Sequence, residues 1–446
     1  MENLTIREIV SRYKKGEFDI IEWNKAFIKN INEKEADIHA WEYFNEEEWL
    51  NKLGAVLQNH PQRFSDLLGV PVGIKDIFNT IDMPTSMGSP IWKGFTPGND
   101  ARVVHNIKFQ GGISAGKTVT AEFAVHTPNE TRNPWNFNFS PGTSSSGSAA
   151  AVAAGMVPVS IGTQTAGSVI RPASYCGVFG FKPSFGTLPR TGMLKTTDTL
   201  DTIGIFATNS LDCEILFDAM RVKGLDYPFV HQRLENEEYQ KKISSKWKVG
   251  IVNNQHPVMQ DYEGYAKEAF TNFVTKLEGN NAVELVKPAF DENFYNAHHI
   301  QETIYHKALS YYFKKEFAEH ILMSKVMYEI IDEGNKITPA QYLLAIKGQT
   351  ELAESLNKIF ENADILITLS TAATAPAFGI AIDPPDTCLI WTMCGFPAVS
   401  IPLFEHNGMP FGLQIIAKKY CDYKLLAFVK ELTSGGLFPE FSKTVS

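Results

Sequence analysis

One stretch of the chain decides the fold: Ser140-Pro141-Gly142-Thr143-Ser144-Ser145-Ser146-Gly147-Ser148-Ala149-Ala150-Ala151-Val152-Ala153-Ala154-Gly155. Seven of its first nine residues are glycine or serine, and the alanine-rich remainder is a strong helix former that ends at glycine. A flexible linker has such a composition, but a linker has no spacing role directly before a helix. A phosphate-binding loop is another alternative, although this stretch contains neither G-x-x-x-x-G-K-S/T nor G-x-G-x-x-G. On its own, the stretch leaves a linker, an anion-binding loop and a catalytic loop open.

Strand-like and helix-forming segments alternate on both sides of this stretch. Apolar runs with breakers lie at 70–74, 113–118 and 157–163, around a helix expected at 148–155. Similar runs return later in the chain, at 248–252, 365–369, 398–402 and 412–417. Apolar strands that alternate with helices are typical of layered proteins, so we expect an α/β fold.

The ends and the middle of this α/β body have a different texture. Residues 1–60 show helical periodicity, and Thr5 with Glu8 has the spacing of a capping box, which predicts a helical N-terminal arm. The α/β body would occupy 61–440. Within it, 212–360 is rich in charged and aromatic residues and poor in glycine, which predicts a helical insertion. The helices of this insertion are expected at 262–277, 294–319 and 339–360.

Composition excludes several classes of protein. The 446 residues include 41 Lys+Arg and 50 Asp+Glu, a net charge of −9, so nucleic acid and anionic membranes are poor candidates for the main partner. The five cysteines are odd in number and none is spaced C-x-x-C, which argues against a disulfide framework or a zinc ribbon. No run approaches the ~18 apolar residues of a membrane span, and the N-terminus lacks the order of a signal peptide. We therefore expect a cytoplasmic protein.

A second glycine-rich turn, at 162–173, follows a strand-like run. Small residues at Ala166 and Gly167 let the backbone approach a ligand closely and direct several N–H groups to one point. An oxyanion hole requires this arrangement, and Ser168 would lie at its edge. An ordinary strand-to-loop turn with a capping serine fits the same residues, so the turn alone leaves both interpretations open.

Lys75 ends the apolar run at 70–74. If its side chain is buried, it loses its charge readily and can act as a base near neutral pH. A surface ion pair with the neighbouring Asp76 is the ordinary alternative for a lysine beside an aspartate. This segment alone leaves a buried base and a surface ion pair open.

Taken together, these segments resemble the amidase signature family. The motifs that carry the resemblance occur in family order, at 70–76 (VPVGIKD), 141–155 (PGTSSSGSAAAVAAG), 162–168 (GTQTAGS), 177–186 (GVFGFKPSFG), 200–204 (LDTIG), 395–402 (GFPAVSIP) and 410–416 (PFGLQII). The match runs from residue 67 to 430 and is specific, because no single short motif carries it. Only 212–360 is unmatched, and there we expect substrate selection.

The resemblance implies a central mixed β-sheet covered by helices on both faces. It also implies a serine–serine–lysine triad, in which Ser168 is the nucleophile, Ser144 the bridging serine and Lys75 the base. No cofactor is expected for this chemistry. The resemblance further implies an oxyanion hole of four backbone N–H groups, those of Thr165, Ala166, Gly167 and Ser168.

Three further positions follow from the resemblance. Ser145 would orient the proton relay. The peptide bond between Thr143 and the bridging serine would be cis, although the family usually has glycine where Thr143 stands. Arg171 completes the order Ser-Val-Ile-Arg, which a malonamidase-like subgroup shares and in which the arginine can hold a substrate carboxylate. A structural pair with a protein carboxylate is the equal alternative for Arg171.

Other catalytic patterns fit poorly. The S-x-x-K pattern of penicillin-binding enzymes occurs several times, as at Ser114–Lys117, Ser245–Lys248 and Ser355–Lys358, without K-T-G, which suggests chance. His299, Glu302 and His306 share one helical face, but H-E-x-x-H is absent, so we expect a polar stripe and no metal site.

Two activities remain, with a third less favoured. The first is hydrolysis of the carbon–nitrogen amide bond of a small-molecule substrate through a seryl acyl-enzyme. The second is that of an amidotransferase A-type subunit, which hydrolyses glutamine and supplies ammonia to a partner that modifies tRNA. Ester cleavage or amide formation on the same acyl-enzyme is the third. The length of the chain and the unmatched 212–360 region favour the first activity, while the substrate, the pathway and a homodimer stay open.

Overall fold

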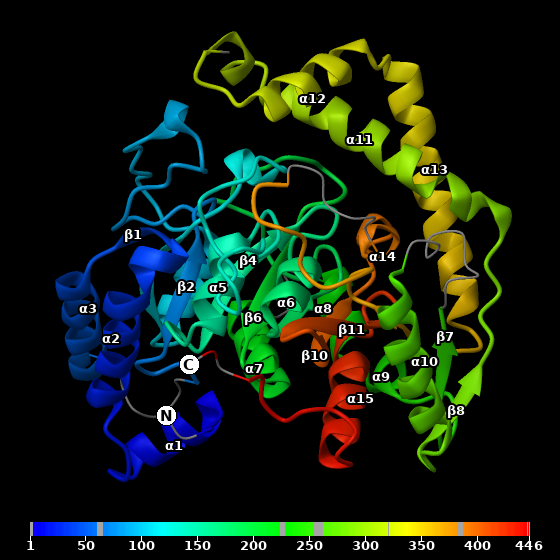
Figure 1. The fold of residues 1–446 in the computed structure, drawn as a ribbon, viewed down its shortest axis with the longest axis horizontal. Coiled ribbons are helices and arrows are strands. Elements are labelled where there is room, and N and C mark those ends of the chain that lie inside the picture. The colour runs from blue at the N-terminus through cyan, green and yellow to red at the C-terminus, as the bar shows by residue number, and fades with distance from the viewer. Residues whose placement is uncertain are drawn as a thin grey trace.

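A large mixed β-sheet runs through the middle of the molecule (Figure 1). The computed structural model describes residues 3–59, 66–223, 228–252, 262–319, 321–380, 387–443 and 445. The strands are β1 (Trp41–Phe44), β2 (Pro71–Lys75), β3 (Ile113–Thr118), β4 (Val159–Gln164), β5 (Phe179–Lys182), β6 (Thr202–Ala207), β7 (Trp247–Ile251), β8 (Val283–Val286), β9 (Ile365–Leu369), β10 (Ala398–His406) and β11 (Met409–Ala417). Within the described residues they form an 11-stranded sheet in the order β1-β3-β2-β4-β6-β5-β10-β11-β9-β7-β8.

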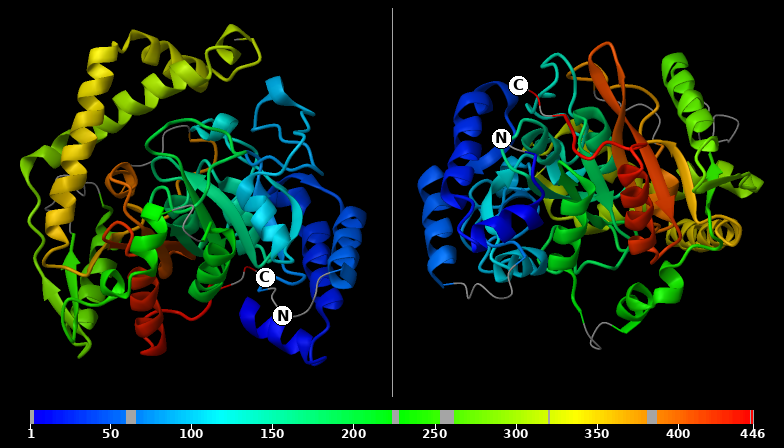
Figure 2. Two further views of the ribbon diagram at one scale, coloured as in Figure 1. Left: turned by 180° about the vertical axis from the view of Figure 1, so that it is seen from behind. Right: turned by 90° about the horizontal axis from the view of Figure 1, so that it is seen from below.

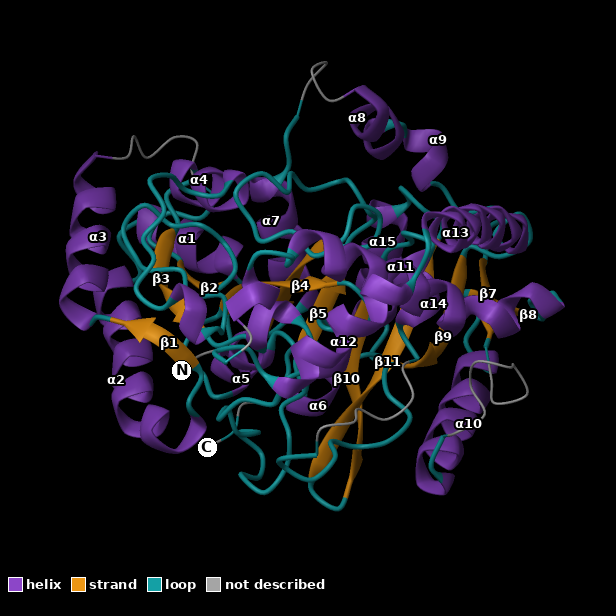
Figure 3. Cartoon of the chain, turned by 90° about the horizontal axis from the view of Figure 1, so that it is seen from above, coloured by secondary structure: helices purple, strands orange, loops and turns teal. Residues whose placement is uncertain are grey.

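Helices cover both faces of this sheet, as the view from above shows (Figure 3). Parallel pairing joins β2 to β3 and β4, and joins β7 to β8 and β9, while the other neighbours are antiparallel. The predicted α/β fold with a mixed sheet is therefore confirmed. The described helices are α1 (Ile6–Lys14), α2 (Ile20–Ile38), α3 (Glu46–Asn59), α4 (Arg102–Phe109), α5 (Ser146–Ala153), α6 (Ile170–Cys176), α7 (Ser210–Met220), α8 (Pro228–Glu235), α9 (Glu237–Gln240), α10 (Gly264–Glu278), α11 (Ala297–Tyr312), α12 (Lys325–Lys336), α13 (Pro339–Ile359), α14 (Leu389–Met393) and α15 (Asp422–Ser434), with 3₁₀ turns at Pro90–Trp92, Glu122–Ala124, Glu292–Asn296 and Glu316–Glu319.

The serine- and alanine-rich stretch forms α5, which packs over β4 and β2 at the centre of the sheet. Every residue of this helix is buried. Its small side chains allow a close approach to neighbouring backbone, above all at Gly147. A Cβ atom there would lie 2.3 Å from Ala40 O and 2.4 Å from Val119 N, so only glycine fits. The second half of the stretch is therefore a packed core helix, and the linker alternative is wrong.

The N-terminal arm is helical except at one strand. α1 begins with the predicted capping box, in which Glu8 N donates to Thr5 Oγ1 at 3.3 Å and Thr5 N donates to Glu8 Oε2 at 2.8 Å. β1, in contrast, is extended and pairs antiparallel with β3, so the expectation of a helical 1–60 is wrong at Trp41–Phe44. This strand of four residues is too short for an alternating pattern to stand out from the helical periodicity on either side.

The region 212–360 contains both helices and strands on one side of the molecule. β7 matches the strand expected at 248–252, and α10 and α13 match the helices expected at 262–277 and 339–360. The helix expected at 294–319 is divided into a 3₁₀ turn, α11 and a second 3₁₀ turn, and sequence patterning missed β8. α11, α12 and α13 form an arch beside the sheet (Figures 1 and 2). Among the described residues, no helix combines the length and the apolar character needed to cross a bilayer.

Candidate active site

Lys75 is the last residue of β2, a strand that is buried along its whole length between β3 and β4. Its side chain is fully buried, and Nζ lies 2.8 Å from Ser144 Oγ, 2.9 Å from Ser145 Oγ and 3.0 Å from Thr163 Oγ1. The alternative of a surface ion pair with Asp76 is therefore wrong. The amine meets three hydroxyl groups inside the protein instead.

Burial decides the charge of this amine. Loss of hydration holds the pKa of Lys75 well below its usual value, and the negative charge of Asp201 opposes that shift only in part. A neutral amine carries a lone pair that can accept a proton from a hydroxyl group. Each neighbouring hydroxyl group can donate or accept, so these neighbours satisfy the amine in either protonation state. The environment of Lys75 therefore suits a group that takes up and returns a proton.

Ser144 and Ser145 lie directly before α5, and the peptide bond between Thr143 and Ser144 is cis. The carbonyl oxygen of Ser144 accepts a hydrogen bond from Ala121 N at 3.1 Å. Ser145 Oγ accepts from Thr163 N at 3.3 Å and donates to Thr163 O at 3.2 Å. Contacts with two other segments of the chain thus hold both serines beside the lysine amine.

The turn that follows β4 is tied to its surroundings by side chains. Gln164 Oε1 accepts from the backbone N–H groups of Val169 at 2.7 Å and Ile170 at 2.9 Å. Thr392 Oγ1, on α14, donates to Ala166 O at 2.6 Å. The turn is therefore held both from its own strand and from a helix more than two hundred residues away, since the last bond spans 226 positions.

Asp201 holds the same turn from a third side. Its buried carboxylate accepts from Thr165 Oγ1 at 2.9 Å, and from the hydroxyl and backbone N–H groups of both Thr196 and Thr197. Five hydrogen bonds to one buried carboxylate make a strong anchor, because bonds to a charged acceptor are the stronger kind. Sequence reasoning missed this role, and the only signal for it was the position of Asp201 inside the 200–204 motif.

Four successive backbone N–H groups of this turn have no protein acceptor. Within the described part of the chain, those of Thr165, Ala166, Gly167 and Ser168 donate no hydrogen bond. Ser168 Oγ has no hydrogen-bond partner there either, although only 6% of the residue is exposed. Buried N–H groups are nearly always paired, so an unpaired run indicates a place where a ligand can bind. The amine of Lys75 is thus hydrogen-bonded to three hydroxyl groups, while the backbone donors of the turn and the hydroxyl of Ser168 are available to a ligand.

Arg171 is the second residue of α6 and is 4% exposed. Its backbone N–H donates to Gly167 O at 2.9 Å, which joins the first turn of the helix to the turn that carries Ser168. A buried arginine therefore lies within one helical turn of Ser168 in the sequence.

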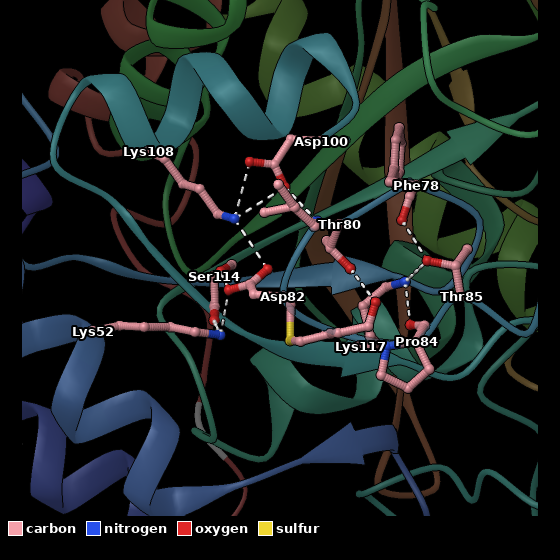
Figure 4. Close-up of polar contacts among 12 residues, drawn as sticks. Lys52, Phe78, Thr80, Asp82, Pro84, Thr85, Asp100, Lys108, Ser114 and Lys117 are labelled. Atoms are coloured by element: carbon pink, nitrogen blue, oxygen red, sulfur yellow. Dashed lines mark hydrogen bonds and ion pairs between the residues drawn. The ribbon is translucent and has the colours of Figure 1, made fainter. Parts of the chain in front are cut away.

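A second buried lysine anchors the loop that follows Lys75. Lys117, on β3, forms an ion pair with Asp76 at 2.8 Å, and both side chains are buried. Lys117 Nζ also donates to Pro84 O at 3.0 Å and to Thr85 Oγ1 at 2.7 Å, as Figure 4 shows. The end of β2 and the loop beyond it are therefore bound to the same lysine on the neighbouring strand.

The strand that carries Lys117 also contains a phosphate-loop pattern, outside the serine-rich stretch. Residues 111–118 read GGISAGKT and match G-x-x-x-x-G-K-T. In nucleotide-binding proteins this pattern forms a loop between a strand and a helix. Here Ile113–Thr118 is itself strand β3, and Lys117 is buried against Asp76. The geometry therefore does not support a phosphate site at this pattern.

Replacement of Lys117 by methionine is expected to lower the free energy of unfolding by about 3–5 kcal/mol, because it leaves the buried carboxylate of Asp76 without its counter-charge. Urea denaturation at neutral pH measures this loss. Lys443→Met is the control, since its ion pair with Glu405 has a lysine side chain that is 75% exposed, and it should be indistinguishable from the wild type. Equal stabilities for the two variants would contradict the assignment of a structural role to Lys117.

A surface groove of about 660 Å³ lies along α11, α12 and α13. Its lining includes the helical face of His299, Glu302 and His306, and His306 Nδ1 lies 3.2 Å from Glu333 Oε2. Burial lowers the pKa of His306, and the charges of nearby glutamates oppose that shift. Among the described residues, no group of three or more His, Cys, Asp or Glu side chains is arranged to hold a metal ion. The three residues thus form a polar stripe along this groove.

Comparison with known sequences gives one family and a set of named relatives. A family model described as Amidase matches residues 22–426. The A-type subunit of glutamyl-tRNA(Gln) amidotransferase from Halothermothrix orenii is 30% identical over 465 residues, with 95% of each chain covered. The protein of the same name from Sulfolobus acidocaldarius is 28% identical over 474 residues, with 96% of this chain and 97% of the relative covered.

Solved structures share the fold over nearly the whole chain. A crystal structure of an amidase superposes with a TM-score of 0.84 at 23% identity and covers 97% of this chain and 100% of that chain. The A-type subunit of glutamyl-tRNA(Gln) amidotransferase from Thermotoga maritima superposes with a TM-score of 0.78 at 25% identity, with 99% and 98% covered. The complex of 6-aminohexanoate cyclic dimer hydrolase with its substrate reaches 0.81 at 23% identity, with 98% and 97% covered. At 23% identity, a structural likeness establishes the fold alone.

Proposed function

This chain belongs to the amidase signature family, and from that premise we propose that it hydrolyses the carbon–nitrogen amide bond of a small molecule through a seryl acyl-enzyme. In this proposal Ser168 is the nucleophile, Ser144 the bridging serine and Lys75 the base. The observation that carries it is the fully buried Lys75 amine, 2.8 Å from Ser144 Oγ, next to a turn whose four N–H groups are unpaired within the described residues.

The proposed reaction begins with a proton relay. Neutral Lys75 takes the proton of Ser144 while Ser144 takes that of Ser168, whose Oγ bonds to the amide carbon. Negative charge develops on the carbonyl oxygen, where the N–H groups of Thr165, Ala166, Gly167 and Ser168 stabilise it. The proton returns through the same groups to the leaving nitrogen, and the carbon–nitrogen bond breaks. Water then attacks the acyl-enzyme, and the acid leaves.

Two supporting groups keep this arrangement in place. Ser145 orients the amine, since its hydroxyl lies 2.9 Å from Lys75 Nζ and bonds to the backbone of Thr163 on both sides. Asp201 orients the proposed oxyanion hole through Thr165. Ser145 fixes the orientation of the amine, and Asp201 fixes that of the backbone donors. This matters because preorganised donors need no rearrangement when the charge develops on the substrate oxygen.

Each region of the chain has its own role in this proposal. Residues 61–440 form the catalytic body, 1–60 form an arm that packs on it, and 212–360 select the substrate. Support for the last assignment comes from α11, whose end contacts the loop that holds Ser144: the rings of Phe313 and Phe123 lie 4.6 Å apart. A region that departs from the family motifs and yet touches the site is suited to distinguish substrates.

The names of the relatives favour a second candidate, the amidotransferase A-type subunit, which hydrolyses glutamine for a partner. One experiment separates the two candidates. It measures the ammonia that the purified chain alone releases from short neutral amides, anionic half-amides and glutamine. We expect the purified chain to release ammonia from a small amide. We also expect its native molecular mass to be that of a monomer or homodimer. Ammonia from glutamine alone, and only in the presence of partner proteins, would favour the second candidate. No ammonia from any amide under either condition would contradict both candidates.

Arg171 is proposed to bind a carboxylate on the acyl side of the substrate. Arg171→Lys should reduce kcat/KM for half-amides such as malonamic acid by about tenfold, because a point charge does not reproduce the bidentate fork. Arg171→Met should reduce it further and leave neutral amides such as propionamide less affected. Initial rates of ammonia release measure both substrates. An equal loss for both, together with a lowered melting temperature, would show that Arg171 is a structural residue that pairs with a protein carboxylate.

A further inference from the structure

α11 and its C-terminal cap contact two elements that hold the loops with the proposed catalytic residues. At its C-terminal end, the ring of Phe313 packs at a tilt against that of Phe123, two residues after Ala121, whose N–H binds the carbonyl of Ser144. α11 also packs against α14, whose Thr392 binds the turn after β4. The helix is therefore joined to elements that hold both loops, and the side chains on its buried face are candidates for contact with a substrate.

Tyr305 is on that buried face, in the middle of the helix. Its ring meets the ring of His126 edge-on at 6.0 Å, and His126 belongs to the segment that follows Phe123. Burial raises the pKa of the Tyr305 hydroxyl, and the charge of Asp201 raises it further. Asp201 also holds Thr165, so Tyr305 and the turn with the proposed oxyanion hole share one charged neighbour.

The hydroxyl of Tyr305 has no hydrogen-bond partner among the described residues, although only 5% of the residue is exposed. Tyr312, on the same helix, donates to Asp198 Oδ1 at 2.8 Å, and the buried hydroxyl of Tyr262 pairs with Thr368. A hydroxyl group that has no protein partner can donate a hydrogen bond to a ligand. Tyr305 thus carries an unused donor beside the site.

We propose that the Tyr305 hydroxyl donates a hydrogen bond to a second, neutral carbonyl group of the substrate, one that is separate from the amide bond to be cleaved. This inference rests on the proposed function and adds the substrate class: small amides with another amide or carbonyl group. A neutral acceptor fits better than an anion, because the carboxylate of Asp201 is near and would repel a second negative charge. Tyr305 is then a specificity-determining residue and takes no part in the proton relay.

The test compares substrates that differ only in the second carbonyl group. Succinamide and malonamide carry it, whereas isocaproamide and isovaleramide have an isopropyl group of the same shape in its place. For the wild type we expect kcat/KM to favour each diamide about five- to tenfold, and for Tyr305→Phe we expect that preference to disappear. Tyr311→Phe is the matched control, because Tyr311 is on the same helix and 75% exposed, and it should keep the wild-type preference.

A thermal melt supplies an independent measurement. Removal of a hydroxyl group that has no protein partner should leave the melting temperature of Tyr305→Phe unchanged or raise it, whereas removal of a bonded one lowers it. A wild type without diamide preference, an unchanged preference in Tyr305→Phe, or a lowered melting temperature would each overturn the inference. Labelling of the wild type by a fluorophosphonate, checked in the same preparation, reports separately on the proposed function, since it needs the serine nucleophile but not Tyr305.

Discussion

Ser168→Ala is expected to lower kcat by about 10⁴-fold or more and to abolish labelling by a fluorophosphonate. The reason is that the acyl-enzyme needs a hydroxyl oxygen at this position, and water has no comparable orientation there. Ser168 Oγ has no hydrogen-bond partner among the described residues, so its loss leaves no protein group unpaired. The fold should therefore stay intact, and intact protein mass after labelling measures the result.

The matched control is Ser174→Ala, on the adjoining helix α6. Ser174 is buried as well, but its hydroxyl pairs with Thr371 Oγ1 at 2.8 Å and accepts from Gly412 N at 2.8 Å. We expect this variant to lose some stability and still to be labelled. Persistent labelling of the Ser168→Ala protein at another serine would remove Ser168 from the role of nucleophile.

Lys75→Met should lower kcat by about three orders of magnitude or more, because a serine hydroxyl is a weak nucleophile without a base and the thioether cannot take its proton. Methionine has a similar length, so the packing around β2 is largely kept. Lys182→Met is the control: Lys182 is another fully buried lysine, held by the carbonyl of Phe396, and outside the proposed site. Turnover per folded molecule should survive in Lys182→Met. Turnover of Lys75→Met within tenfold of the wild type would require a different base.

The same lysine sets the expected direction of the pH dependence. Burial lowers the pKa of Lys75 in the folded protein, and only the neutral amine can act as a base, so kcat/KM should fall as the pH decreases through that lowered value. The unfolded chain binds this proton at higher pH than the folded chain does. The contribution of Lys75 to stability therefore rises with pH between the lowered folded pKa and the ordinary unfolded one, and is most unfavourable below both. Lys75→Met should remove this contribution to the pH dependence of the free energy of unfolding.

Much of the local structure could be predicted from sequence. The strand expected at 365–369 is β9 with the same bounds, the helix expected at 339–360 is α13 but for its last residue, and the capping box of Thr5 and Glu8 is present. These features depend on residues close to one another in the chain. β1 was missed because a four-residue strand is defined by its partner β3 and has little pattern of its own.

Part of the candidate site could also be predicted from sequence, and part could not. Motif positions pointed to Lys75, Ser144, Ser145 and Ser168, and the first three are in direct contact. The anchors of these groups were not predictable, because each is a contact between distant segments. Asp201 reaches Thr165 across 36 positions, and Lys117 belongs to a pattern that predicts a phosphate loop in another setting.

By itself, the sequence determined the α/β class, the core helix α5, the family motifs and the identity of the candidate triad, because each of these is encoded in short runs of residues. Tertiary structure alone decided the state of those residues. It buried Lys75 against hydroxyl groups that lie 69 to 88 positions away and so lowered its pKa. It also left Tyr305, on α11, without a hydrogen-bond partner among the described residues. Burial and pairing belong to the folded arrangement, since loss of water and the approach of distant groups occur only when the sheet and its helices assemble.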